Sequence, residues 1–424
     1  MSSADPFTLD LFETTALASG WTLGAPAAAD VPRQPLSTDD ENPIDEPSAK
    51  TVSERKGANF YLDGDRGLAA SWRGRARDNL AAIRLAVSIA AENRPATPAE
   101  QAELVKFIGF GASDLANGCF RRPGEAEFRK GWEEIGGELE AEVESTDYAS
   151  LARCTQYAHY TPEFVVRAIW LGLQRLGFRG GRVLEPGMGT GLFASLMPEP
   201  LRAESHVTGI ELDPVTAKIA RLLHPRARIV NEDFARVALP SPFDLAIGNP
   251  PFSDRTVRSD PAFRPLALRL HDFFIVKAID RLTAGGLAAF VTSHGTMDKA
   301  DARARQHLAG MADLIAAIRL PEGSFRAAAG TDVVVDVLFL RRRRADEVPS
   351  APAWLDLKEV RAADAEAGAI RVNEYFLAHP EMVLGGHDLT RGIHGPDETY
   401  TCRALSREPV FTYYYSPANG SRNQ

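Results

Sequence analysis

The sequence predicts an α/β fold, in which a mainly parallel sheet of seven strands is covered by helices and follows a helical N-terminal domain. Short apolar runs recur seven times after residue 181, amphipathic segments separate most of them, and helix-forming residues dominate between residues 66 and 150. Strands that alternate with helices require crossover connections, which make the sheet mostly parallel and cover both of its faces.

Length and composition are those of a globular protein with more than one folded unit. The chain has 424 residues, of which 44% are hydrophobic and 25% charged, so that neither a fibrous nor a wholly disordered protein fits. Its three cysteines form no CxxC pair, which disfavours a disulfide framework and a zinc cluster. The sequence shows neither a secretion signal nor an apolar run of ~18 residues. We expect a cytoplasmic protein without a membrane segment.

The first 56 residues differ from the rest in composition and charge. They are rich in Ala, Pro, Ser and acidic residues, and residues 1–50 hold nine acidic but two basic side chains. We expect residues 1–56 to form a disordered acidic arm. This arm carries most of the net charge of −9, so the remainder is nearly neutral and neither requires nor excludes nucleic acid as a partner.

A helical domain is predicted at residues 57–150. Leu80, Ile83, Leu85 and Ile89 lie among strong helix formers. A second helix should start after Thr97, because a threonine followed by Pro98 is typical of an N-cap and the first helical position.

The sheet is predicted within residues 151–345, and residues 346–424 form a C-terminal extension with only weak strand or helix signals. The seven expected strands lie at residues 182–186, 206–212, 227–233, 243–249, 287–293, 314–320 and 333–340.

A glycine-rich turn follows the first predicted strand. The segment EPGMGTG occupies residues 185–191, and its glycines Gly187, Gly189 and Gly191 let the backbone approach a ligand closely. A dinucleotide-binding loop would require glycine at Leu192, so pyrophosphate binding is disfavoured. A tight turn needed only for packing explains one such glycine better than three.

Acidic and aromatic residues follow the next two strands. Glu211 and Asp213 end the second strand, where a carboxylate can accept hydrogen bonds from both hydroxyls of a ribose. Asp233 and Phe234 follow the third strand and suit the amino group and the face of an adenine. A helix N-cap or a solvated turn is the common alternative for any one of these carboxylates.

The fourth strand ends in the most informative tetrapeptide, Asn249-Pro250-Pro251-Phe252. Two prolines stiffen the backbone, so that the Asn249 side-chain oxygen and the Pro250 carbonyl can accept hydrogen bonds from one planar NH2 group. Phe252 supplies a flat apolar face for the ring that carries this group. The alternative is a turn followed by a core phenylalanine, which is common for Asn-Pro alone.

EPGMGTG followed by NPPF on a seven-stranded pattern resembles the S-adenosylmethionine-dependent amino-methyltransferases, particularly the DNA adenine-N6 methyltransferases with their [DNS]PP[YFW] motif. The segment AHYTPE at residues 158–163 resembles the upstream cofactor motif of one branch of these enzymes. Across residues 66–380, segments such as FRKGWEEI, TSHGTMDK and IRLPEGSF resemble the methylase module of plasmid and phage methylase-helicase proteins. The sequence has no G-x-x-x-x-G-K-[ST] loop, so we expect a free-standing or shortened version without helicase activity.

The resemblance implies a Rossmann-like methyltransferase domain that binds S-adenosylmethionine. Glu185 and the glycines would hold the methionine moiety, Glu211 the ribose, and Asp233 with Phe234 the adenine. The implied cofactor-binding set is completed by Tyr160, Thr161, Pro186, Gly191 and Asp213.

It also implies that the target adenine leaves the DNA helix and enters an active site made by residues 249–252, without a metal ion. Phe252 would stack on the base, while Asn249 and Pro250 accept the hydrogens of its N6 amino group. Recognition of a DNA sequence would be weak or supplied by a separate specificity or helicase partner. The arginines at 341–344 are candidate phosphate contacts, although such a run is commonly a solvated face.

Three other functions stay open. The same tetrapeptide also serves methyltransferases that act on guanine-N2 of RNA or on a protein glutamine, since each presents a planar nitrogen. A non-catalytic module that binds cofactor and partners is the third, although the intact NPPF and cofactor loops argue against it. Host protection, evasion of restriction and epigenetic marking are equally open as roles.

Overall fold

The computed structural model describes residues 57–122, 124–156, 161–239, 242–349, 354–361, 369–391 and 398–404. The acidic arm predicted at residues 1–56 lies outside the described residues, as does Tyr160. Within the described ranges, no helix combines the length and the apolar character needed to cross a membrane.

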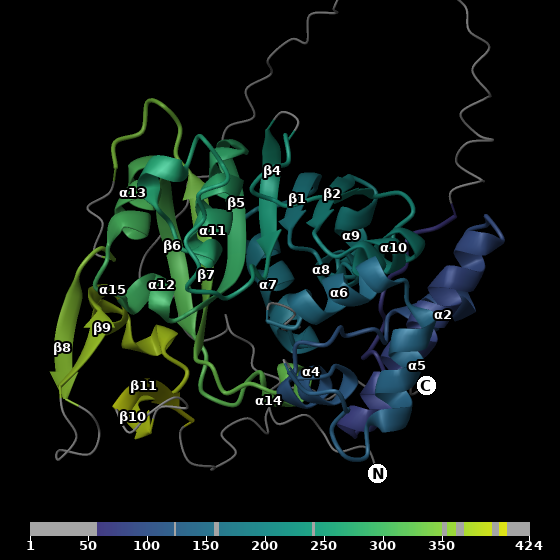
Figure 1. Ribbon diagram of the computed structural model, residues 1–424. Helices are drawn as coiled ribbons and strands as arrows, with labels where there is room; N and C mark the ends of the chain where they lie inside the picture. Colours follow the sequence, from purple (N-terminus) through teal and green to yellow (C-terminus); the bar gives the residue numbers. More distant parts are fainter. Residues whose placement is uncertain are drawn as a thin grey trace, which may run out of the picture.

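All seven predicted strands pair in one sheet of order β3-β2-β1-β4-β5-β7-β6, which confirms the predicted α/β class (Figure 1). Every neighbouring pair is parallel except those made by β7, which runs antiparallel to β5 and β6. The strands are β1 (Gly181–Pro186), β2 (Ser205–Glu211), β3 (Arg228–Asn231), β4 (Phe243–Gly248), β5 (Leu282–Ser293), β6 (Ala312–Arg319) and β7 (Val335–Arg342).

Apolar residues alternate between the two faces of the sheet, which builds one core on each side. Leu184 and Phe290 face a core that includes α11 (Leu270–Asp280) and α13 (Arg303–Met311). Val183 and Val291 face a second core that includes α7 (Glu163–Arg175). Both faces of a mainly parallel sheet are buried in this way, which explains the nearly continuous apolar runs of its strands.

A helical unit precedes the sheet, as predicted, and packs against one of its helices. It contains α2 (Trp72–Ala91), α3 (Pro98–Leu104), α4 (Ser113–Cys119), α5 (Glu133–Glu142) and α6 (Ser145–Cys154). Thr97 caps α3 through a capping box with Glu100, as the Thr-Pro pair predicted. The core of this unit includes Ile219 and Leu223 from α10 (Pro214–Leu223).

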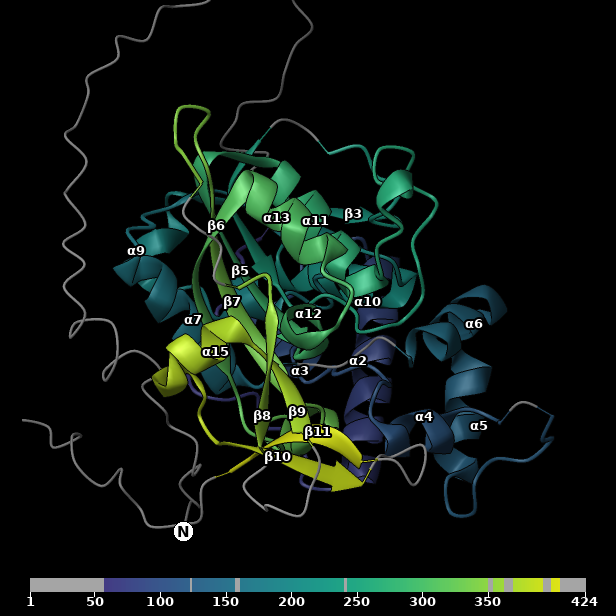
Figure 2. The same ribbon diagram turned by 90° about the vertical axis from the view of Figure 1, so that its left-hand side faces the viewer.

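The domain boundary predicted at residue 150 falls inside α6, and the boundaries themselves stay predictions. Figure 2 shows α4, α5 and α6 to one side of the sheet, and the C-terminal extension below it in this view.

The C-terminal extension forms more structure than its weak signals predicted. It holds two antiparallel hairpins, β8 (Leu357–Arg361) with β9 (Ala369–Asn373) and β10 (Gly386–Arg391) with β11 (Glu398–Arg403). Buried Arg319 at the end of β6 donates to Tyr400 of β11 over 3.1 Å and pairs with Asp336 at 2.8 Å. Tertiary contacts of this kind stabilise short hairpins that are marginal by themselves. The remaining helices are α8 (Leu192–Ser195), α9 (Glu199–Arg202), α12 (Gly295–Asp298), α14 (Arg326–Ala329) and α15 (Glu374–Ala378).

Candidate active site

A cavity lies at the edge of the sheet where β1, β2, β3 and β4 end. This edge is where open α/β sheets bind ligands, because the connections on the two sides of the first strand run in opposite directions there. The lining residues are Cys154, Thr161, Glu185, Gly187, Met188, Gly189, Leu192, Phe193, Ile210, Glu211, Leu212, Asp213, Thr216, Glu232, Asp233, Phe234, Asn249, Pro251, Arg255, Leu270 and Phe274.

The glycine-rich turn brings the cofactor motif against the NPPF segment. Gly187 has a φ of 67°, a left-handed conformation that favours glycine. Its N–H donates to the carbonyl of Ile210 over 2.8 Å, which ties the turn to β2. A Cβ at this glycine would lie 3.4 Å from Phe274 and 3.7 Å from Pro251. The first strand end and the fourth are therefore nearly in van der Waals contact.

Glu185 lies at the end of β1 with 2% of its surface exposed. Burial raises the pKa of this carboxyl well above its usual range, while hydrogen bonds from the backbone of Ala194 and Phe193 oppose the rise. Glu185 thus both lines the cavity and holds the first turn of α8 in place.

Glu211 joins the first two strand ends. One of its carboxylate oxygens accepts the N–H of Gly189 over 2.8 Å, and the other accepts the N–H of Asp213 over 2.9 Å. Burial raises the pKa of Glu211 to about 7, and the nearby charge of Asp213 acts in the same direction. Accepting hydrogen bonds from a ligand would favour the ionised form of this carboxyl.

Asp213 is the N-cap of α10 and is 1% exposed. Its Oδ2 atom accepts from the backbone N–H and the hydroxyl of Thr216, each over 2.8 Å. Its Oδ1 atom is buried and has no hydrogen-bond partner among the described residues. Since buried acceptors without a donor are uncommon, this oxygen is suited to a ligand that donates a hydrogen bond.

The third strand end presents Asp233 and Phe234 to the cavity. Phe234 is 2% exposed, and its ring lies 4.8 Å from that of Phe274, so it forms part of the cavity wall. Leu212 also lines the cavity and is 54% exposed. Leu212 therefore exposes more apolar surface than Phe234 does. The sequence analysis did not identify Leu212, although it directly follows Glu211.

The NPPF segment follows β4, and two of its four residues line the cavity: Asn249 and Pro251. Pro250 is buried, whereas Phe252 is half-buried and packs against the core on the α7 face. The ring of Phe252 lies 6.5 Å from that of His271 at an interplanar angle of 78°, an edge-to-face contact that fixes its orientation.

The structure brings ten of the fifteen predicted site residues to this one cavity. Pro186, Gly191, Pro250 and Phe252 do not line it, and Tyr160 lies outside the described residues. Gly191 is the left-handed N-cap of α8, and a Cβ there would lie 2.7 Å from His224. Close packing alone thus explains this glycine.

Cys154, Arg255 and Phe274 line the cavity without having been predicted. Burial raises the pKa of the Cys154 thiol to about 12, so it stays protonated at neutral pH and is a poor nucleophile. A cluster of arginines directly after NPPF was the signal that could have identified Arg255.

The arginine run at 341–344 lies at the opposite edge of the sheet, because β7 is antiparallel and ends there. Arg341 pairs with Asp313 over 3.1 Å and with Glu347 over 2.9 Å, and Arg343 pairs with Asp313 over 3.0 Å. These contacts favour the structural interpretation of the run over phosphate binding. Among the described residues, no cluster of His, Cys, Asp and Glu could hold a metal ion.

The strand order and the strand-end cavity define a Rossmann-like class I methyltransferase. Residues 146–366 match the N-6 DNA methylase family, and the chain belongs to this family of S-adenosylmethionine-dependent enzymes.

Known proteins with similar sequences or structures cover parts of the chain. The chain is 29% identical over 200 residues to the defense against restriction protein B of Escherichia phage P1, covering 46% of this chain and 9% of that protein. It is 33% identical over 92 residues to the tRNA1(Val) (adenine(37)-N6)-methyltransferase of Aliivibrio fischeri, covering 20% of this chain and 39% of that one. The methyltransferase subunit of a type I restriction-modification system from Streptococcus thermophilus matches with a TM-score of 0.39 and 19% identity, covering 63% of this chain and 66% of that one.

The residues of the cavity fit S-adenosylmethionine, the cofactor of the family. A nucleoside needs acceptors for its hydroxyls and an apolar face for its base, and the cavity offers Glu211, Asp213 and Leu212. An amino-acid moiety needs close backbone approach, which the left-handed Gly187 and Gly189 allow.

Proposed function

We propose that this protein transfers a methyl group from S-adenosylmethionine to the N6 amino group of adenine in DNA, with residues 249–252 as its active site. The observation that carries the proposal is that Asn249 and Pro251 line the same cavity as Glu211 and the glycine turn. A methyl donor and an amino group could therefore meet at the end of β4. The family match to DNA methylases supports DNA as the substrate.

The NPPF residues would position the amino group. When bound, the cofactor supplies an electrophilic methyl group on its sulfonium. Asn249 Oδ1 and the Pro250 carbonyl would accept hydrogen bonds from the two N6 hydrogens, so that the nitrogen lone pair is directed at that methyl. N6 would gain the methyl group as the bond from that group to sulfur breaks, and would release one proton to solvent. Phe252, held edge-to-face by His271, would stack on the adenine ring. Fixed acceptors and orientation supply the rate in such a site.

The cofactor-binding roles follow the strand ends. We propose that Glu211 and Asp213 accept hydrogen bonds from the ribose, that Asp233 accepts one from the adenine amino group, and that Leu212 covers the adenine ring. The methionine end would lie against Glu185, Gly187 and Gly189, with Thr161 beside it.

The adenine must leave the base stack to reach this cavity, because its N6 atom is otherwise held inside the duplex. We propose DNA with a flipped adenine as the partner of the site. Recognition of a particular sequence is proposed to come from a separate specificity or helicase partner.

RNA is the second candidate substrate, and one similarity favours it. The Aliivibrio relative that is 33% identical is named as a tRNA adenine-N6 methyltransferase, and the chemistry at N6 is the same. The DNA proposal is preferred because the DNA methylase family matches residues 146–366, whereas the tRNA enzyme aligns over 92 residues.

The test is to express the wild type and Asn249→Ala in a host that lacks adenine methylases and to quantify methylated nucleosides by mass spectrometry. We expect N6-methyladenine in DNA with the wild type, and at least a hundredfold less with Asn249→Ala. Calorimetric binding of S-adenosylmethionine by the variant controls for folding. Methylation confined to RNA, or to protein, would contradict the DNA assignment.

A further inference from the structure

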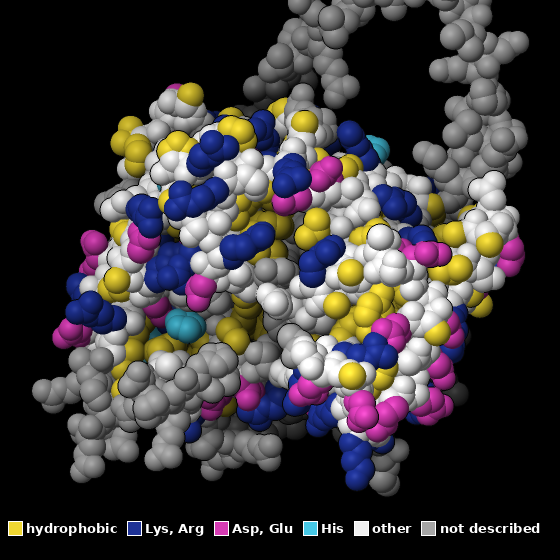
Figure 3. All heavy atoms as spheres, in the orientation of Figure 1, with side chains coloured by type: hydrophobic (Ala, Val, Ile, Leu, Met, Phe, Trp, Pro, Cys, Tyr) yellow, Lys and Arg dark blue, Asp and Glu magenta, His cyan; other side chains and the backbone are white. Residues whose placement is uncertain are grey.

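The segment between the NPPF tetrapeptide and α11, residues 253–269, is rich in exposed arginines. Arg255, Arg258, Arg264 and Arg269 are all exposed, and we call this segment the arginine strap. Figure 3 shows basic side chains spread over the middle of the face on which α11 and α13 lie.

Internal ion pairs neutralise both acidic residues of the arginine strap. Asp260 pairs with buried Lys277 over 2.8 Å, and Asp254 pairs with Arg269. Arg255, Arg258 and Arg264 make no ion pair among the described residues. These three arginines therefore give the arginine strap a net positive charge that nothing in the described structure balances.

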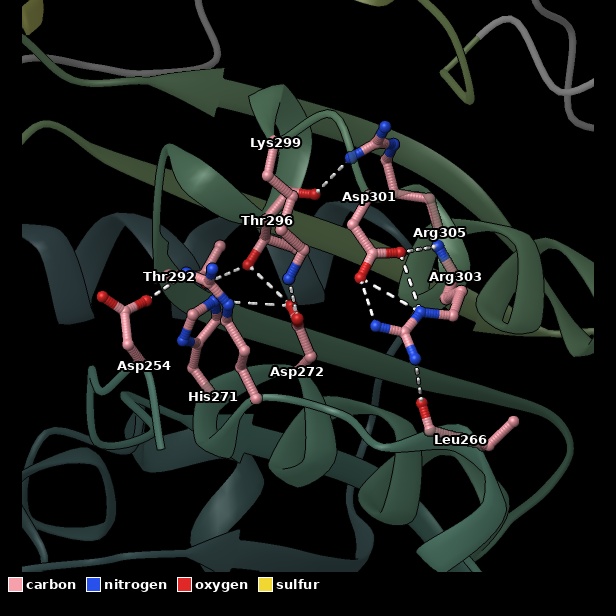
Figure 4. A network of polar contacts seen from close by, with 11 residues as sticks. Asp254, Leu266, His271, Asp272, Thr292, Thr296, Lys299, Asp301, Arg303 and Arg305 are labelled. Carbon is pink, nitrogen blue, oxygen red and sulfur yellow. Dashed lines mark hydrogen bonds and ion pairs between the residues drawn. The ribbon is translucent and has the colours of Figure 1, made fainter. Parts of the chain in front are cut away.

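The backbone of the arginine strap is anchored to the fold, which limits where these charges can lie. Val257 and Leu268 are buried in the core, and the N–H of Val257 donates to the carbonyl of Leu268 over 2.9 Å. Figure 4 shows Arg303 of α13 reaching the carbonyl of Leu266, at 3.4 Å. A backbone that is already ordered loses less entropy when its side chains bind an anion.

The arginine strap is also adjacent to the proposed transfer site. It starts directly after Phe252, and Arg255 lines the cavity itself. A flipped nucleotide carries a phosphate on its 5′ side and another on its 3′ side, so the backbone of the target strand must pass close to the cavity mouth. Arginine guanidinium groups match phosphate oxygens in both charge and geometry.

We propose that Arg255, Arg258 and Arg264 of the arginine strap contact the phosphate backbone of DNA that flanks the target adenine. This inference rests on the proposed function, because it takes DNA as the substrate. Contacts to phosphates carry no sequence information, so the arginine strap positions the duplex and leaves recognition of bases to other elements.

The test is the salt dependence of DNA binding, measured by fluorescence anisotropy on a labelled duplex that contains adenines. Each neutralised phosphate contributes about 0.9 to the slope of log Kd against log salt concentration, whatever the sequence. We expect Arg258→Gln to lower this slope by about 1, and the triple variant Arg255→Gln/Arg258→Gln/Arg264→Gln to lower it by about 3.

Arg344→Gln is the matched control, since Arg344 is also exposed but lies at the opposite edge of the sheet and should leave the slope unchanged. Arg258→Gln/Arg264→Gln leaves the cavity lining intact, so this variant should bind S-adenosylmethionine as the wild type does. Its KM for DNA should rise while kcat at saturating DNA is kept.

The outcomes separate this inference from the proposed function. A wild type that methylates DNA, together with a triple variant whose slope is unchanged, overturns the arginine strap as a DNA contact and leaves the function standing. A wild type that binds DNA with the expected slope changes but yields no N6-methyladenine supports the arginine strap and overturns the function. A wild type that does not bind DNA overturns both.

Discussion

At the residue scale, most of the titratable side chains that line the cavity are carboxyl groups, and their environments differ. Glu185 is buried and Glu211 is half-buried, and both have raised pKa values. The partners of Glu185 belong to α8, whereas those of Glu211 belong to the turns after β1 and β2. Asp213 instead uses one oxygen to cap α10, while its other oxygen is buried and has no hydrogen-bond partner among the described residues. A carboxyl group thus supports the first turn of α8 at Glu185, whereas at Asp213 one carboxylate oxygen is left for a ligand that donates a hydrogen bond.

The raised pKa of Glu211 predicts a pH-dependent stability of the cofactor-free protein. Because the pKa is about 7 in the folded chain and about 4.3 in an unfolded one, this carboxyl stabilises the fold most below pH 4.3. That contribution, about 4 kcal/mol, is lost as the pH rises from 4.3 through 7. Denaturant unfolding of the wild type and Glu211→Gln from pH 5 to 8 measures it.

The comparison with Glu211→Gln is needed because a buried histidine acts in the opposite direction. Burial lowers the pKa of His224 to about 4, so its contribution is present above pH 6.5 and lost as the pH falls through 4. The difference between the two proteins removes this shared effect. We expect the wild type to lose stability relative to Glu211→Gln as the pH rises, and parallel curves would contradict the assignment.

At the scale of elements, the arginine strap depends on a buried ion pair. Lys277 of α11 is 3% exposed and Asp260 is 8% exposed. Lys277 also donates to the carbonyl of Phe234 over 2.7 Å, so one side chain connects the arginine strap, α11 and the third strand end. Removing one member of such a pair leaves an uncompensated buried charge.

We therefore expect Lys277→Met to destabilise the protein by about 3–5 kcal/mol. Asp260→Asn should relieve part of this loss in the double variant, since it removes the orphaned charge while its side-chain oxygen can still accept the N–H of Ala262. Thermal unfolding of the wild type, both single variants and the double variant gives the coupling between the two sites. Additive losses would show that the pair does not act as a unit.

At the scale of the whole molecule, the helical unit and the sheet share packing across the boundary predicted at residue 150. Ile219 and Leu223 lie on α10, which follows β2, yet they belong to the core formed by α2 to α6. The carbonyl of Leu223 also accepts the N–H of Phe60 over 2.7 Å. The two parts should therefore unfold together.

Ile219→Ala tests this shared packing, because Ile219 is fully buried where α10 meets the helical unit. We expect a loss of about 2–5 kcal/mol and a single unfolding transition by calorimetry in both the wild type and the variant. Two transitions, with only one shifted by the substitution, would show that the helical unit unfolds independently.

Much of the fold and part of the site could be predicted from the sequence because their signals are local. An apolar run indicates a buried strand, Thr97 before Pro98 indicates a helix start, and glycines or prolines at strand ends restrict the backbone wherever the chain folds. The successive strand ends then had to meet, because parallel strands place their carboxyl ends at one edge of a sheet.

Other features depend on contacts between distant segments, and only the tertiary structure decided them. The arginines at 341–344 lie away from the cavity because β7 is antiparallel, a direction that the strand's own residues do not encode. Phe234 is buried while Leu212 is exposed, because α11 supplies Phe274 to cover the former. The sequence by itself thus determined the strands and the chemistry at their ends, whereas packing between remote segments decided which side chains a ligand can reach.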